Sequence, residues 1–137
     1  MPTVKGVIET SLYVDDLGRS TRFYEDVLGF ERMVGDERFC ALSVAGRQVL
    51  LLFHKGGSLK PGVVPGGVIP PHDGAGQLHL AFAIGTEEWE PWRRRLTEKG
   101  VPIESTVRWE RGGQSLYFRD PDQHLVELIT PGCWPIY

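Results

Sequence analysis

The chain has 137 residues, of which 41% are hydrophobic and 24% charged, and its formal net charge is −3. This composition is typical of a globular protein, and the small negative charge gives no reason to expect nucleic acid or an anionic membrane as a partner. No apolar run is long enough to cross a bilayer and no signal-peptide core is visible, so we expect a cytoplasmic protein with two reduced cysteines, Cys40 and Cys133.

The first half of the chain predicts a strand, a helix and three further strands. Residues 7–14 alternate apolar and polar side chains, as a half-buried strand does. Residues 16–28 carry apolar side chains at helical spacing, with Asp16 as the N-cap and Gly29 at the end. Three shorter strand patterns follow, at 30–34, 38–45 and 48–54.

The second half repeats this order. A strand at 77–84 precedes a helix at 86–99 with Thr86 as the N-cap, and further strands are predicted near 103–109, 114–119 and 124–130. Residues 120–123 form the last hairpin turn. We therefore expect an α+β fold in which residues 1–137 form one domain of two βαβββ modules, at about 4–55 and 77–131.

Residues 56–76 join the two modules as a long loop containing seven Gly and four Pro. Loops of more than about 12–15 residues are uncommon in compact domains unless they have a role. The loop could be a lid over a site, closing with His72 and Asp73, or a flexible connector. The sequence leaves both interpretations open.

Two potential metal ligands occupy equivalent places in the repeat. Glu9 and His79 each lie on the first strand of a module, on the face opposite the main apolar side chains. Glu127 lies in an apolar strand, where an ionised carboxylate is unfavourable unless it is paired or binds a cation. The corresponding position in the first module is Leu51, so the repeat predicts three protein ligands.

Three ligands with open coordination positions are typical of a catalytic metal, whereas structural sites usually have four. One imidazole and two carboxylates suit Mn²⁺ or Fe²⁺ and could also hold Zn²⁺ or Ni²⁺. Each residue also has an alternative role. Glu9 could pair with Lys5 or Arg47, His79 could be a hydrogen-bonded strand residue, and Glu127 could be salt-bridged.

Three segments carry family motifs, and they are Leu12-x-Val14-x-Asp16-Leu17-x-x-Ser20-x-x-Phe23-Tyr24-x-x-x-Leu28-Gly29-Phe30, His79-Leu80-Ala81-Phe82 and Tyr117-Phe118-Arg119-Asp120-Pro121-Asp122-Gln123-His124-Leu125-Val126-Glu127. In these segments the chain resembles the vicinal oxygen chelate superfamily, which includes glyoxalase I, fosfomycin-resistance thiol transferases, extradiol dioxygenases and bleomycin-resistance proteins. The resemblance implies two βαβββ modules that form a cup with a divalent metal at its base. It also implies a homodimer whose cups combine modules of both chains.

The resemblance assigns His79 and Glu127 to the second and last metal positions of the family, and Glu9 to the first, where His is usual. Leu51 replaces the fourth ligand of glyoxalase I, which argues against a lactoylglutathione lyase.

The resemblance also implies roles for residues beside the metal. Tyr117 corresponds to a tyrosine that contacts a bound substrate oxygen, and a phenol there can donate a hydrogen bond or act as an acid. His54 corresponds to the acid–base histidine of extradiol dioxygenases, although an exposed strand end is an equal alternative. Ser11 could contact the substrate, and His124 is interpreted as a turn residue.

Two functions follow. The first is a metal-dependent enzyme that binds a small substrate through two oxygens, with ring-cleaving oxygenase chemistry ranked slightly above thiol addition to an epoxide. The alternative is a non-catalytic binding protein of the bleomycin-resistance type, whose cup would be walled by aromatic side chains, namely Trp109, Trp134, Tyr13 and Phe53.

Overall fold

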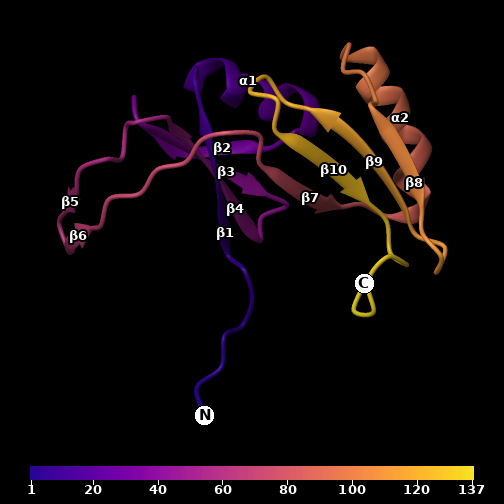
Figure 1. Cartoon of the computed structure of the whole chain (residues 1–137), viewed down its shortest axis with the longest axis horizontal. Coiled ribbons are helices and arrows are strands. Elements are labelled where there is room, and N and C mark those ends of the chain that lie inside the picture. Colours follow the sequence, from indigo (N-terminus) through magenta and orange to yellow (C-terminus); the bar gives the residue numbers. More distant parts are fainter. The chain divides into compact units, whose positions relative to one another are not determined.

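The computed structural model describes all 137 residues, which form two compact units, Met1–Ala75 and Gly76–Tyr137 (Figure 1). Each unit contains a four-stranded sheet and follows the order strand, helix, strand, strand, strand. The predicted α+β class with two βαβββ modules is confirmed. Neither α-helix has the length and apolar character needed to span a membrane.

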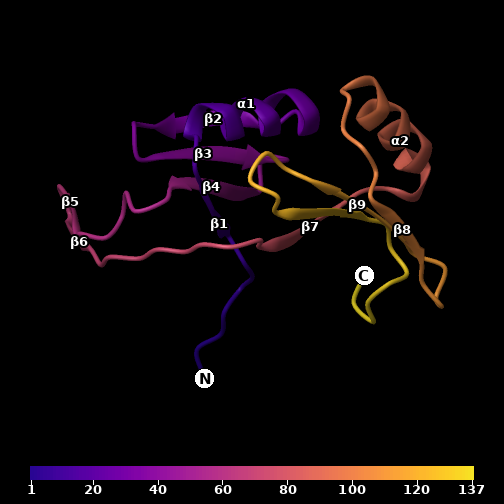
Figure 2. The same ribbon diagram turned by 45° about the horizontal axis from the view of Figure 1, so that its top comes forward.

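In the first unit, the sheet has the order β1-β4-β3-β2, with β1 parallel to β4 and the other neighbours antiparallel (Figure 2). Its elements are β1 (Glu9–Val14), α1 (Leu17–Leu28), β2 (Glu31–Gly35), β3 (Phe39–Val44) and β4 (Gln48–His54).

Both ends of α1 are fixed by the residues that the sequence indicates. Asp16 is the N-cap, and its side chain accepts a hydrogen bond from the backbone N–H of Arg19 at 3.0 Å. Gly29 ends the helix in the left-handed conformation, with φ 73°, and donates its N–H to the carbonyl of Glu25.

The two faces of the first sheet differ sharply in burial. The face that packs on α1 carries the core, where alternate residues of β1 and β4 are fully or almost fully buried, namely Leu12, Val14, Leu50 and Leu52. The intervening residues of β1, namely Glu9, Ser11 and Tyr13, project from the opposite face. This open face is therefore available for a site.

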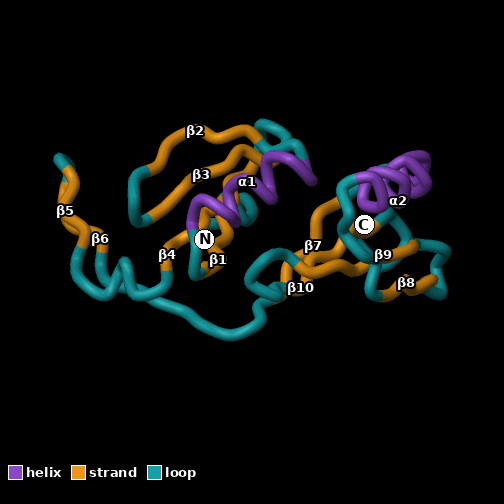
Figure 3. The backbone as a smooth tube through the Cα atoms, turned by 90° about the horizontal axis from the view of Figure 1, so that it is seen from above, coloured by secondary structure: helices purple, strands orange, loops and turns teal.

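The segment 56–76, predicted as a loop, contains a short hairpin of β5 (Gly62–Val64) and β6 (Gly67–Ile69) (Figure 3). The prediction of a loop is therefore wrong at these two short strands. β-Branched residues favour strands and Pro-Gly favours a turn, so the Val-Val-Pro-Gly-Gly-Val-Ile run explains the hairpin locally.

In the second unit, the sheet has the order β7-β10-β9-β8, with β7 parallel to β10. Its elements are β7 (His79–Ala83), the 3₁₀ helix η1 (Thr86–Glu88), α2 (Trp89–Glu98), β8 (Ser105–Arg108), β9 (Gln114–Arg119) and β10 (Leu125–Ile129). The helical segment begins at Thr86, and its N-cap is Gly85, whose N–H donates to the Glu88 carboxylate. Thr86 is therefore not the N-cap.

The second sheet repeats the division of faces. Alternate residues of β9 and β10 form its core and are at most 1% exposed, namely Leu116, Phe118, Val126 and Leu128. The residues between them, which include Tyr117 and Glu127, project to the other face.

The strand registers of the two units correspond. Ser11 pairs with Leu51 in the first sheet, and Ala81, at the matching place in β7, pairs with Glu127 in the second. Leu51 and Glu127 therefore occupy the same position of the repeat, as the sequence predicts.

Candidate functional site

The open face of the second sheet brings His79 and Glu127 together. His79 Nε2 lies 3.2 Å from Glu127 Oε1 across the parallel β7–β10 pair. The Glu127 side chain is 8% exposed and that of His79 is 51% exposed. The carboxylate is thus held in the sheet while the imidazole remains accessible from outside.

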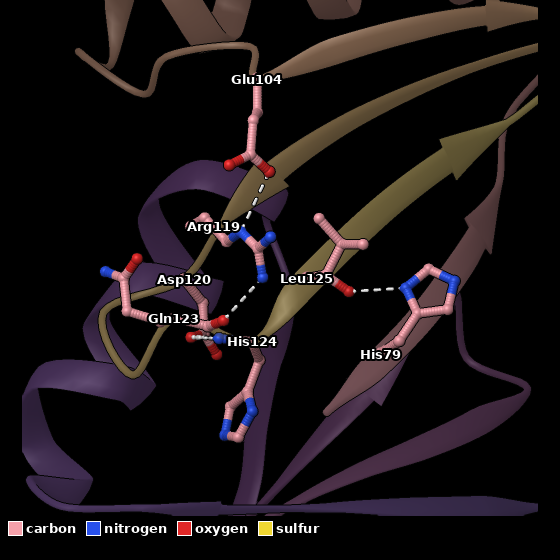
Figure 4. A network of polar contacts seen from close by, with 7 residues as sticks. All are labelled: His79, Glu104, Arg119, Asp120, Gln123, His124 and Leu125. Atoms are coloured by element: carbon pink, nitrogen blue, oxygen red, sulfur yellow. Dashed lines mark hydrogen bonds and ion pairs between the residues drawn. The ribbon is translucent and has the colours of Figure 1, made fainter. Parts of the chain in front are cut away.

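The backbone fixes which nitrogen of His79 faces the carboxylate. His79 Nδ1 lies 2.9 Å from the carbonyl oxygen of Leu125 (Figure 4). A carbonyl oxygen can only accept, so Nδ1 carries a proton. Nε2 of the neutral imidazole then presents a lone pair to Glu127 Oε1, and two acceptors at 3.2 Å need a proton or a cation between them.

This arrangement fits a divalent metal. Imidazoles that bind metals through Nε2 almost always donate their other N–H to a carbonyl or carboxylate, which fixes the tautomer and orientation. An imidazole nitrogen and a carboxylate oxygen are donors shared by Mn²⁺, Fe²⁺ and Zn²⁺ sites. Within the second unit, no third His, Cys, Asp or Glu side chain joins the pair.

A buried hydrogen-bond chain positions the Glu127 carboxylate. Ser115 Oγ donates to Glu127 Oε2 at 2.5 Å, and Trp109 Nε1 donates to Ser115 Oγ at 2.8 Å. Ser115 is fully buried. With Oε2 engaged by Ser115, Oε1 is the oxygen directed to His79.

Tyr117 completes the group on this face. It is directly opposite Glu127 in the β9–β10 pair, and its ring centroid is 6.3 Å from that of His79. Burial and the negative charge of Glu127 raise the pKa of the Tyr117 phenol above its usual value. Tyr117 is therefore a protonated hydrogen-bond donor at neutral pH.

The turn before β10 holds the start of β7. His124 Nδ1 accepts the backbone N–H of Leu78 at 2.9 Å, immediately before His79. The Asp120 carboxylate accepts the backbone N–H of Asp122 at 2.9 Å. It also accepts the backbone N–H of His124 at 2.9 Å (Figure 4).

The 120–123 turn is confirmed, but His124 lies just after it and is not a turn residue. Its side chain is fully buried, and its ring accepts the part-buried backbone N–H of Leu78, just before β7.

The remaining predicted residues lie in the first unit. Glu9 and Ser11 line a cavity of about 490 Å³ on the open face of its sheet. His54 is exposed at the end of β4, where it pairs in register with Val14. Strand alternation directs its side chain to the face opposite that of Phe53, and it does not line the cavity.

The structure thus brings His79, Glu127 and Tyr117 together and places Glu9 and Ser11 in a cavity without His54. Sequence reasoning missed Ser115 as the partner of Glu127. The period-two alternation of β9 could have placed it on the same face as Tyr117, since the two residues are separated by one position. Trp109 was interpreted as a possible cup wall, and its hydrogen bond to Ser115 left no signal in the sequence.

The two βαβββ units and the imidazole–carboxylate pair on an open sheet face are typical of glyoxalase-like proteins. A family model described as the Glyoxalase/Bleomycin resistance protein/Dioxygenase superfamily matches residues 6–128. The chain belongs to this superfamily.

Individual relatives include a metallothiol transferase. The chain is 30% identical over 128 residues to the metallothiol transferase FosB of Staphylococcus haemolyticus, covering 93% of this chain and 84% of the relative. It is similar to the crystal structure of a lactoylglutathione lyase from Agrobacterium tumefaciens, with a TM-score of 0.88, 32% identity, and 98% and 99% of the two chains covered.

The fosfomycin resistance protein FosX of Listeria monocytogenes, in complex with Mn(II) and sulfate, has a TM-score of 0.69 and 25% identity, with 93% of this chain and 91% of FosX covered.

Proposed function

We propose that this protein is a metal-dependent transferase that adds a thiol to a small, oxygen-bearing electrophile. The observation that carries the proposal is the pair of acceptors, His79 Nε2 and Glu127 Oε1, held 3.2 Å apart by separate hydrogen bonds to Leu125 and Ser115. His79 and Glu127 are two metal ligands in this proposal. Glu9 is the third candidate, on the family resemblance.

The metal, when bound, would act as a Lewis acid that stabilises negative charge on the substrate oxygens. In thiol addition to an epoxide, a sulfur–carbon bond forms while a carbon–oxygen bond breaks, so the ring oxygen gains charge and needs a proton. Tyr117 supplies a protonated phenol beside His79, with its pKa raised by burial and by Glu127. His79 and Glu127 would hold the metal.

Thiol addition ranks above ring-cleaving oxygenase chemistry in this proposal, which reverses the order that the sequence favours. Relatives of about the same length are named as metallothiol and glutathione transferases. His54, the residue that favours oxygenase chemistry, projects from the face opposite the cavity. A homodimer in the cytoplasm is part of the proposal, on the family resemblance.

A binding protein of the bleomycin-resistance type is the second candidate. Tyr13 and Phe53 do line the cavity and stack with centroids 5.8 Å apart. Neither Trp109 nor Trp134 lines this cavity. Trp134 is 63% exposed, and the indole N–H of Trp109 donates to Ser115. A binding protein of this type would not need the His79–Glu127 pair in its fixed orientation. We therefore rank this function second.

The test is elemental analysis of the purified protein after reconstitution with Mn²⁺, on the wild type and on His79→Gln, Glu127→Gln and Glu9→Gln. The matched control is Glu37→Gln, which removes an exposed carboxylate outside the site. We expect stoichiometric metal in the wild type and the control, and its loss in His79→Gln and Glu127→Gln. Absence of bound metal from the reconstituted wild type would overturn the proposal.

Thiol transfer is tested by following the disappearance of free thiol when the Mn²⁺-loaded protein is mixed with fosfomycin and with glutathione or cysteine. We expect consumption that depends on metal and is lost in Glu127→Gln. Oxygen uptake with a catechol, in the absence of thiol consumption, would restore the oxygenase ranking.

A further inference from the structure

The cavity of the first unit has features that define a class of ligand. It is bounded by β1, β3, β4 and the segment that follows β4, and its volume of about 490 Å³ lies within the range of small-molecule sites. Its lining combines aromatic rings with polar and cationic groups. All of these residues belong to the unit 1–75.

One end of the cavity is an aromatic platform. Tyr13, Phe53 and Phe39 lie side by side on three neighbouring strands, in direct register. Successive ring centroids are 5.8 and 6.1 Å apart, with interplanar angles of 25° and 30°. The three side chains are only partly buried, and part of their aromatic surface lines the cavity.

The same cavity contains two cationic side chains, Arg38 and Lys60. Both are exposed and neither forms an ion pair within the chain. Arg38 and Lys60 both line this cavity together with the three aromatic residues. The single acidic residue in the lining, Glu9, lies four residues before Tyr13 on β1, which corresponds to about 13 Å.

The segment between β4 and β7 is attached to this end of the cavity. Tyr13 Oη and His72 Nδ1 share a hydrogen bond of 2.7 Å, and the His72 ring is 4.5 Å from that of Phe53 in an edge contact. The backbone N–H of His72 donates to the carbonyl of Ser58 at 3.0 Å. This bond ties the two ends of the segment together, and Lys60 lies two residues beyond Ser58.

We propose that this cavity binds a small organic anion with a flat apolar body. The body would lie on the platform of Tyr13, Phe53 and Phe39, and the oxyanion would be neutralised by Arg38 and Lys60. As the substrate site of the enzyme, the cavity rests on the proposed function. As an anion-binding site, it depends only on residues of the first unit.

The test is calorimetric titration of the full chain in the presence of EDTA, with phenylphosphonate and benzoate as aromatic anions. Benzamide serves as the neutral aromatic and inorganic phosphate as the anion without a ring. We expect saturable binding of at least one aromatic anion, and at least about tenfold weaker binding of benzamide and phosphate. Preference between phenylphosphonate and benzoate identifies the oxyanion.

The decisive variant is the double substitution Arg38→Gln/Lys60→Gln. We expect it to weaken binding of the aromatic anion about tenfold or more, with unchanged thermal unfolding. The matched control, Lys5→Gln/Arg47→Gln, removes two exposed cations of the same unit that do not line the cavity. The control is expected to bind as the wild type does.

Three results would overturn the inference: no aromatic anion binds, benzamide binds as tightly as benzoate, or the two double variants lose affinity equally. Because the titration is run without metal, its outcome is separate from that of the metal analysis. Anion binding by a protein that never takes up metal would leave this site intact and remove the proposed function. Metal binding without anion binding would do the reverse.

Discussion

Ser115 donates its hydroxyl proton to Glu127 Oε2 at 2.5 Å, from a fully buried position. The bond leaves Glu127 Oε1 directed to His79 and fixes the carboxylate in one orientation. In the proposed metal site, Ser115 is therefore a positioning residue that would act through Glu127. Partners of this kind typically alter metal affinity by about 10–100-fold when they are removed.

Ser115→Ala should weaken Mn²⁺ binding within that range of about 10–100-fold while the protein stays folded. Trp109→Phe, which keeps an aromatic ring but removes the N–H that donates to Ser115, should weaken it in the same direction and by less. Competition titrations against a metal indicator dye measure both affinities. A Ser115→Ala protein that binds Mn²⁺ as tightly as the wild type would show that Glu127 needs no support from Ser115.

Metal binding should stabilise the folded protein through His79 and Glu127. A ligand that binds only the folded state at 100 times its Kd stabilises it by about 2.7 kcal/mol. We expect Mn²⁺ to raise the unfolding temperature of the wild type and EDTA to reverse the rise. Glu127→Gln should show no rise, and the surface variant Glu37→Gln should behave as the wild type. Equal stabilisation of all three proteins would locate the metal elsewhere.

His124→Ala should destabilise the second unit. The change leaves the part-buried backbone N–H of Leu78 without its acceptor, which costs up to about 1–3 kcal/mol. His124→Asn offers a shorter side chain with an acceptor and should recover part of this loss. Denaturant unfolding measures both variants. If the two variants unfold alike, the ring contributes by filling space rather than by accepting the Leu78 proton.

The sequence predicts the strands, the first helix and the repeat because these depend on local periodicity. The equivalence of Leu51 and Glu127 follows from that repeat, and the strand registers reproduce it. The burial of His124 could not be predicted, because its partner Leu78 is 46 positions away in the chain. The predicted strand at 48–54 coincides with β4, so alternation alone already places His54 on the face opposite Phe53, and only the family resemblance put it beside the site.

The polar links of the site were also beyond prediction. A serine two positions before Tyr117 is compatible with many partners, and only the side-chain geometry selects Glu127 and Trp109. Cationic residues such as Arg38 and Lys60 appear in the sequence as ordinary surface charges. Their association with an aromatic platform requires the folded sheet and the segment after β4.

Gly74→Ala should loosen the segment that borders the cavity. An added Cβ at Gly74 would lie 2.4 Å from a ring carbon of Tyr13, so the ring or the segment must move. Overpacking of this kind destabilises by about 1–3 kcal/mol. Gly66→Ala is the matched control, because a Cβ there meets nothing within 4 Å.

Limited proteolysis of residues 56–76 should be faster in Gly74→Ala than in the control and the wild type. Equal cleavage of all three proteins would mean that the contact with Tyr13 does not restrain the segment.

The Tyr13 phenol should make the protein less stable in alkaline solution. Burial and the negative charge of Asp73 raise the pKa of Tyr13 above its ordinary value of 10.0. Above pH 10 the unfolded chain loses this proton before the folded chain does. The unfolded state then binds fewer protons, and stability falls as pH rises.

Tyr13→Phe removes this contribution together with the bond to His72, so its stability should decline less steeply above pH 10 than that of the wild type. Denaturant unfolding at a series of pH values measures the slopes, and the difference in phenolate absorbance between the two proteins gives the titration of Tyr13 itself. A difference titration centred at or below pH 10 would contradict the prediction.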